Sequence, residues 1–109
     1  MTKEEVIVFV HRVRHIVTPG HFAEFIEALK AVNEAAPTVG LPTYRLYVTL
    51  FGDLNEVWAE AEYDSLDGHV EAFEKARENA EWQRVFRAMI GHTVPGTLRD
   101  YPLEPVALD

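Results

Sequence analysis

One junction, between His11 and Phe25, narrows the possible folds more than any other part of the chain; it reads HRVRHIVTPGHFAEF. A run in which β-branched residues alternate with histidines and arginines meets Thr18-Pro19-Gly20 and continues with apolar residues at helical spacing. A period of two is typical of a strand, and a period near 3.6 is typical of a helix. The junction therefore predicts the first half of a β-α-β unit.

The first strand is expected from Val6 to Val17, and its two faces differ. Its odd-numbered positions are Ile7, Phe9, His11, Val13, His15 and Val17. Its even-numbered positions are Val6, Val8, Val10, Arg12, Arg14 and Ile16. Because neither face is simply polar, we expect a central strand that is covered on both sides. The parity predicts that the histidines face the helices and that the arginines face another layer.

The first helix is expected after this strand and ends before Pro37. Thr18 can cap it, and Pro19 suits its first turn. Its apolar stripe consists of Phe22, Phe25, Ile26, Leu29 and Val32. A proline disfavours helical geometry in the residue before it, so the helix should stop near Ala35-Ala36.

Two strands, over residues 43–51 and 55–63, are expected to form a hairpin around Gly52-Asp53-Leu54. If Gly52 lies opposite Asn55, one face of the hairpin is apolar. That face pairs Leu50 with Val57, Val48 with Ala59, Leu46 with Ala61 and Tyr44 with Tyr63. The other face pairs Phe51 with Glu56, Thr49 with Trp58, Tyr47 with Glu60 and Arg45 with Glu62. A slip of one residue would destroy both patterns.

The second helical region is expected to begin at Asp64 or Ser65, with Leu66, His69, Val70 and Phe73 on its apolar side. A new apolar phase follows Asn79, with Trp82, Val85, Phe86 and Met89, so the region is either one kinked helix or two helices that end at Gly91. Residues 96–101 are expected to be an edge strand, because the prolines that surround them cannot donate ladder hydrogen bonds.

The element order β-α-β-β-α-β predicts a single α+β domain over residues 1–109. Right-handed crossovers give a ferredoxin-like, four-stranded antiparallel sheet of order 4-1-3-2 with the helices on one face. The other face would then hold aromatic, aliphatic and charged side chains together. Such a face is either an ordinary amphipathic sheet or the contact surface of a homodimer, in which Arg12, Arg14 and Arg45 pair with Glu60 and Glu62.

Composition excludes several classes of function. A formal net charge of −8 disfavours nucleic acid and anionic membranes, and the absence of cysteine removes disulfides and thiolate chemistry. We expect a cytoplasmic protein, because neither a signal peptide nor a run of about 18 apolar residues is visible. We expect no metal, because His11 and His15 lie about 13 Å apart on a strand. We expect no nucleotide cofactor, because no phosphate-binding loop is present.

A small-molecule site is expected on the helix-facing side of the sheet. Two classes of residue meet there, polar groups that can orient or protonate a ligand and small residues that leave room for one. They are His11, His15, Tyr44, Ala59, Ala61, Tyr63 and His69. The alternative is that the histidines are hydrogen-bonded scaffold and that the tyrosines fill the core. Trp82 is expected to be helix core rather than a stacking platform.

Residues 13–22, VRHIVTPGHF, resemble the strand-to-helix junction of NIPSNAP-like proteins and of other dimeric α/β-barrel families, including the antibiotic-biosynthesis monooxygenases. Residues 79–83, NAEWQ, resemble a turn and tryptophan that those families carry. The resemblance implies a homodimer whose two sheets close into a barrel, with a ligand pocket in each subunit. The haem-degrading members carry an Asn on the first strand and a Trp where this chain has Tyr63, and the stress-responsive branch carries a His-Pro-x-His segment that is absent here. Neither activity is carried over.

Three functions remain open at this point. The first is a homodimeric protein that binds a small, mostly apolar organic molecule and acts on it without a cofactor, as a monooxygenase-like or isomerase-like enzyme. In that case His15 would accept the proton, and Tyr63 or Tyr44 would orient a ligand oxygen. The second is a non-catalytic binding or assembly module. The third is haem binding through His69 or His15, by analogy alone.

Overall fold

The computed structural model describes residues 9–51 and 54–108. The expected start of the first strand, at Val6 to Val8, and the expected turn residues Gly52 and Asp53 lie outside the described residues. The elements in chain order are β1 (Phe9–Ile16), α1 (Phe22–Ala35), the 3-10 helix η1 (Ala36–Val39), β2 (Arg45–Val48), β3 (Glu56–Tyr63), α2 (Leu66–Arg77), α3 (Ala80–Ile90) and β4 (Arg99–Leu103). Within these residues, no helix has the length and apolar character needed to cross a membrane.

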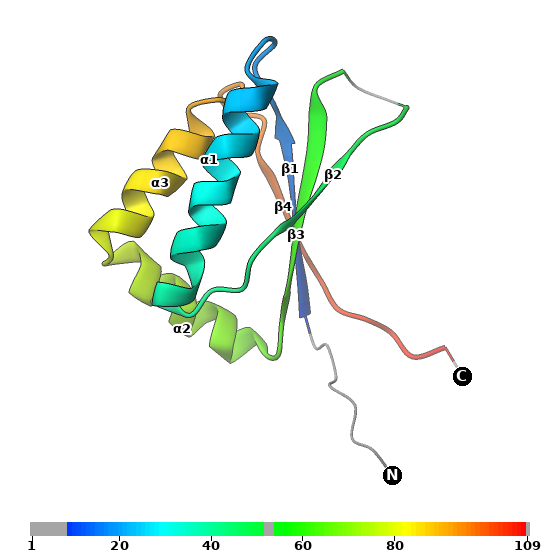
Figure 1. Ribbon diagram of the computed structural model, residues 1–109. Helices are drawn as coiled ribbons and strands as arrows, with labels where there is room; N and C mark the ends of the chain where they lie inside the picture. The colour runs from blue at the N-terminus through cyan, green and yellow to red at the C-terminus, as the bar shows by residue number, and fades with distance from the viewer. Residues whose placement is uncertain (1–8, 52–53, 109) are drawn as a thin grey trace.

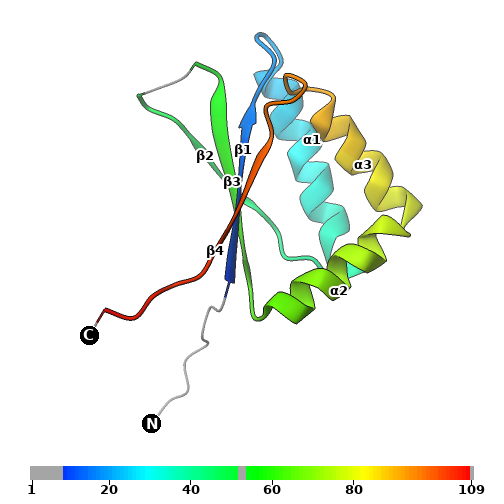
Figure 2. The same cartoon turned by 180° about the vertical axis from the view of Figure 1, so that it is seen from behind.

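The four strands form one antiparallel sheet in the order β2-β3-β1-β4, which is the predicted order read from its other edge. Figures 1 and 2 show α1, α2 and α3 on one side of this sheet, whereas none of the described elements covers the other side. The ferredoxin-like α+β prediction is confirmed. The chain therefore has a covered face and an open face.

Burial along β1 alternates as its sequence predicts. Buried positions are Phe9, His11, Val13, His15 and Val17, and the residues between them are partly exposed. The histidines face the helices and the arginines face the open side. This parity decides which polar side chains enter the core.

The cap predicted for α1 is wrong, because Thr18-Pro19-Gly20-His21 is a separate turn. The His21 N–H donates to the Thr18 carbonyl at 2.9 Å, and Gly20 has φ +86°. Proline followed by a residue with positive φ is the signature of a type II turn. The helix therefore starts only at Phe22, whose side chain is 44% exposed although it was expected in the buried stripe.

The predicted register of the β2–β3 hairpin is wrong by two residues. Arg45 lies opposite Glu60 and Val48 lies opposite Val57. A shift of two positions keeps every side chain on its own face, so the apolar pattern could not distinguish the two registers. Arg45 still pairs with Glu62 at 2.7 Å, but diagonally rather than directly across the ladder. The strand also ends earlier than expected, at Val48, and Leu50 is exposed.

The second helical region is two helices rather than one kinked helix. The Ser65 side chain accepts a hydrogen bond from Gly68 N at 2.9 Å and caps α2, and the Asn79 side chain accepts one from Trp82 N at 2.8 Å and caps α3. The buried residues of α2 are Ala72 and Ala76, not the larger residues of the expected stripe.

Three further details of these elements differ from what the sequence predicts. Leu66 and Val70 of α2 are exposed. The edge strand β4 begins at Arg99, three residues later than expected, and the 3-10 helix η1 was not expected.

Candidate functional site

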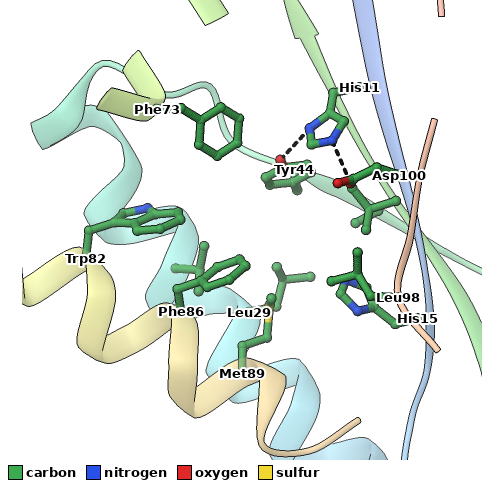
Figure 3. Close-up of a pocket in the computed structure, with 13 residues that line it drawn as sticks. His11, His15, Leu29, Tyr44, Phe73, Trp82, Phe86, Met89, Leu98 and Asp100 are labelled. Atoms are coloured by element: carbon green, nitrogen blue, oxygen red, sulfur yellow. Dashed lines mark hydrogen bonds and ion pairs between the residues drawn. The ribbon is translucent and has the colours of Figure 1, made fainter. Parts of the chain in front are cut away.

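A cavity of about 120 Å³ lies between the covered face of the sheet and the helices (Figure 3). The sheet contributes His11, Val13, His15, Ala59 and Asp100 to its wall. Apolar side chains of α1 and α3 form most of the opposite wall. Four of the predicted site residues, His11, His15, Tyr44 and Ala59, line it. Apolar walls with a few polar groups are typical of small-molecule pockets.

The polar groups at one side of the cavity form a hydrogen-bonded chain centred on His11. Its Nδ1 lies 3.0 Å from the Tyr44 hydroxyl, and its Nε2 lies 2.9 Å from a carboxylate oxygen of Asp100. A carboxylate only accepts, so Nε2 carries a proton; in the neutral tautomer, Nδ1 then accepts from the Tyr44 hydroxyl. Figure 3 shows the imidazole between the two partners. We call Tyr44, His11 and Asp100 the relay.

Pairing between β1 and β4 brings Asp100 into the relay. Asp100 lies opposite Val13, whose side chain points to the helices, so the carboxylate points to the same side. The residues His11 and Asp100 are 89 positions apart in the sequence. No signal in the sequence identified Asp100, because the composition of an edge strand does not reveal which residues of the neighbouring strand lie opposite it.

Tyr44 is held at the entrance of β2 by Asn33 of α1. The Asn33 amide donates to the Tyr44 carbonyl at 2.9 Å and accepts from the Tyr44 N–H at 2.8 Å. This pair of bonds replaces strand pairing for a residue that precedes β2. Burial raises the pKa of the Tyr44 hydroxyl far above its ordinary value, and the neighbouring Tyr63 hydroxyl and Asp100 add to the effect. Tyr44 therefore remains a hydrogen-bond donor across the physiological range.

His15 stands apart from the relay, deeper in the core. It is only 3% exposed and packs against Phe25, with ring centroids 5.6 Å apart. Burial lowers its pKa to about 4, although Asp100 acts in the opposite direction, so the imidazole is neutral at pH 7. Its Nδ1 atom has no hydrogen-bond partner among the described residues.

Trp82 of α3 carries a second buried polar atom without a hydrogen-bond partner. The side chain is 5% exposed, and its Nε1–H also lacks a partner within the described part of the chain. The indole stacks on Phe86, with centroids 4.7 Å apart and ring planes within 13°. Trp82 belongs to the helix core, as its helical phase predicts, and it also lines the cavity. Helical phase alone could not reveal the second role.

The other predicted site residues, Tyr63, His69 and Ala61, are absent from the described lining of the cavity. Tyr63 and His69 pack edge to face, with centroids 4.4 Å apart, in an aromatic cluster that also contacts His11. Burial lowers the pKa of His69 and raises the pKa of Tyr63 to about 12. Ala61 is buried in the core beside them. These residues support His11 rather than line the space next to it.

The site does not fit haem or a metal cluster. A cavity of about 120 Å³ is smaller than the roughly 300–1,000 Å³ of pockets for drug-sized ligands, so a tetrapyrrole has no room. Among the described residues, no three His, Cys, Asp or Glu side chains gather closely enough to hold a metal ion.

Comparisons with known proteins extend over most of the chain. A family model described as NIPSNAP matches residues 13–94. The crystal structure of a NIPSNAP family protein from Agrobacterium tumefaciens str. C58 matches with a TM-score of 0.78 and 20% identity, over 100% of this chain and 95% of the other. An uncharacterized NIPSNAP domain protein from Burkholderia xenovorans matches with a TM-score of 0.73 and 19% identity, over 93% and 97%.

A putative antibiotic biosynthesis monooxygenase from Chloroflexus aurantiacus J-10-fl has the same fold. Its TM-score is 0.66 at 16% identity, over 94% of this chain and 96% of the other. A search of curated proteins finds no match. At these identities the structural similarities establish the fold alone.

Proposed function

The chain belongs to the NIPSNAP family, and we propose that it binds a small, mostly apolar organic molecule in the cavity between its helices and its sheet. One observation carries the proposal: the relay of Asp100, His11 and Tyr44 ends at an otherwise apolar cavity. His11 is buried at the centre of this chain, whereas the Asp100 side chain is 59% exposed. A histidine held between a carboxylate and a hydroxyl can exchange a proton with a ligand.

In this proposal, the relay handles a proton on the ligand. A ligand hydroxyl donates a hydrogen bond to the Tyr44 oxygen. Tyr44 in turn donates its own proton to Nδ1 of His11, and Asp100 orients this imidazole through Nε2. These groups suit a cofactor-free reaction that begins with proton transfer, such as an isomerisation or the first step of an oxygenation. His15 remains the alternative proton acceptor. With a pKa of about 4 it is a weak base, so we assign the stronger role to His11 on the basis of its Asp100 partner.

The open face supports a second part of the proposal, a homodimer that forms sheet to sheet. It holds Tyr47, Trp58 and Tyr101, with Trp58 and Tyr101 centroids 5.7 Å apart. Its charges are paired: Arg12 with Glu60 at 3.1 Å, Arg14 with Glu56, and Arg45 with Glu62. Glu56 was not the partner expected for Arg14. Neutralised charges beside aromatic rings lower the cost of covering this face.

Sedimentation equilibrium tests the dimer. A Trp58→Glu variant places an unpaired charge at the centre of the open face, and we expect a monomer at concentrations where the unaltered chain is a dimer. Leu108→Glu is the matched control, since Leu108 is equally apolar but lies in the exposed C-terminal segment. A monomeric unaltered chain at about 100 μM would remove the dimer from the proposal and leave the cavity intact.

Ligand binding is tested with toluene as an uncharged probe, by NMR titration of the Trp82 indole and Met89 methyl signals. Ala59→Val reduces the space in the cavity, and we expect it to weaken toluene binding at least tenfold. Ala61→Val is the matched control, because Ala61 is as buried on the same strand but does not line the cavity. If toluene shifts neither signal at its solubility limit, the cavity is not a binding site and the proposed function is wrong.

A further inference from the structure

Two side chains that line the cavity from opposite walls each carry a buried polar atom without a partner among the described residues. The atoms are Nε1 of Trp82, on α3, and Nδ1 of His15, on β1. Both side chains are more than nine-tenths buried. An unpaired buried polar group is unfavourable, and native proteins contain few. Figure 3 shows the two rings at opposite ends of the cavity, with Leu29 and Phe86 between them.

The charges around the cavity disfavour an anion. Among the described lining residues there is no lysine or arginine, and the one carboxylate is that of Asp100. His15 is neutral at pH 7, since burial holds its pKa near 4. A carboxylate ligand would lose its hydration and gain no opposite charge. Asp100 does not require a cationic ligand either, because its side chain is 59% exposed to solvent and already accepts a hydrogen bond from His11.

The size and walls of the cavity favour one flat ring. A cavity of about 120 Å³ compares with the roughly 150 Å³ engineered cavity that binds benzene. Trp82 and Phe86 both line the cavity and stack on each other, with centroids 4.7 Å apart and planes within 13°. A further aromatic ring packs favourably on such a pair in offset or edge-to-face geometry.

We propose that the occupant is an uncharged single-ring molecule with polar groups at its two opposite ends, one that accepts from Trp82 Nε1–H and one that pairs with His15 Nδ1. A hydroxyl suits both ends, because it can accept from the indole and can donate to or accept from a neutral imidazole. The ligand class is therefore a para-substituted phenol or its alcohol equivalent. This inference rests on the proposed function and specifies the chemistry of the same site.

Isomeric diols test the inference, because they differ only in the position of one hydroxyl. Hydroquinone, kept reduced under nitrogen, places its hydroxyls at opposite ends of the ring, whereas catechol places them side by side. We expect hydroquinone to bind at least tenfold more tightly than catechol in calorimetric titrations at pH 7. Benzoate and benzylamine, each with a single ring and a charge, should bind more weakly than toluene.

The Trp82→Phe variant removes the donor and keeps an aromatic ring. We expect its affinity for hydroquinone to fall at least fivefold more than its affinity for toluene, and its preference for hydroquinone over catechol to disappear. Trp58→Phe is the matched control on the open face and should change neither. Thermal denaturation of each variant shows whether it is folded.

The outcomes separate this inference from the proposed function. If toluene binds but catechol matches or exceeds hydroquinone, the ligand class is wrong and the cavity remains a binding site. The same conclusion follows if benzoate or benzylamine binds most tightly, or if Trp82→Phe keeps the preference for hydroquinone. If no probe binds, toluene included, the proposed function fails first.

Discussion

Both faces of β1 carry cationic or titratable side chains, but the fold buries those on one face and leaves those on the other partly exposed. His11 and His15 enter the core, where His15 loses its solvent and its pKa falls to about 4. Arg12 and Arg14 stay on the open side, where each pairs with a glutamate of β3. The hydrogen bond from Arg14 correspondingly lowers the pKa of Glu56.

The comparison shows that what lies over a strand decides the chemistry of its side chains. On the covered face, apolar packing isolates polar groups and makes each of them sensitive to a partner. On the open face, water and opposite charges surround the charged groups, so each of them depends less on any single partner. We therefore expect substitutions on the covered face to have large effects and those on the open face to have small ones.

The largest effect is expected from Phe25→Ala, on the helix that covers β1. Phe25 is fully buried and packs against His15, so its loss should lower the free energy of unfolding by about 3–5 kcal/mol in urea titrations. Phe22→Ala, three residues earlier on the same helix, should cost no more than about 1 kcal/mol, because that ring is largely exposed. Equal losses of stability in the two variants would show that packing over the covered face does not make its substitutions more costly.

The pH dependence of stability should reveal the buried neutral His15. The unfolded chain protonates it near pH 6.5 and the folded chain only near pH 4, so protons favour the unfolded state across that range. Stability from this group is complete above pH 6.5 and falls by about 3 kcal/mol as the pH drops to 4. Urea titrations at pH 7 and pH 4 measure this loss of stability. The His15→Leu variant should lose about 3 kcal/mol less than the unaltered chain between these two pH values. A parallel loss in both proteins would place His15 in contact with solvent.

Asn33→Ala should have the next largest effect, since it leaves the Tyr44 N–H and carbonyl without their partner. We expect about 1–3 kcal/mol of lost stability and a changed ¹⁵N shift at His11 Nδ1, because Tyr44 would no longer be held against it. Asn33→Asp keeps the acceptor and loses only the donor, so its loss of stability should lie between zero and that of Asn33→Ala. A normal His11 shift in the alanine variant would show that the strand positions Tyr44 without Asn33.

The smallest effect is expected on the open face, at Arg12 and Glu60. A double-mutant cycle on these two residues should give a coupling of about 0.2–1 kcal/mol that weakens in salt, because Arg12 is partly exposed. Measurements over a range of protein concentrations sharpen the comparison. A coupling that grows with concentration would indicate that a second copy covers the pair, as the proposed dimer requires.

The positions of the candidate site residues illustrate the limits of sequence patterns. The period of two in β1 was enough to send His11 and His15 to the helices, because a strand has only two faces. The same period could not fix the register of β2 on β3, since a shift by two leaves both faces unchanged. Asp100 and the second role of Trp82 followed from the packing of distant segments, for which a single sequence carries no local signal.

The sequence by itself determined the order of the elements, the faces of the central strands and the acidic, cysteine-free character of the chain, because these depend on local spacing and composition. Only the tertiary structure decided that Asp100 meets His11 across β1 and β4, that Asn33 holds Tyr44, and that a cavity remains between Trp82 and His15. The physical reason is that such contacts depend on strand register and on how side-chain volumes fill the core, and both are properties of the assembled fold.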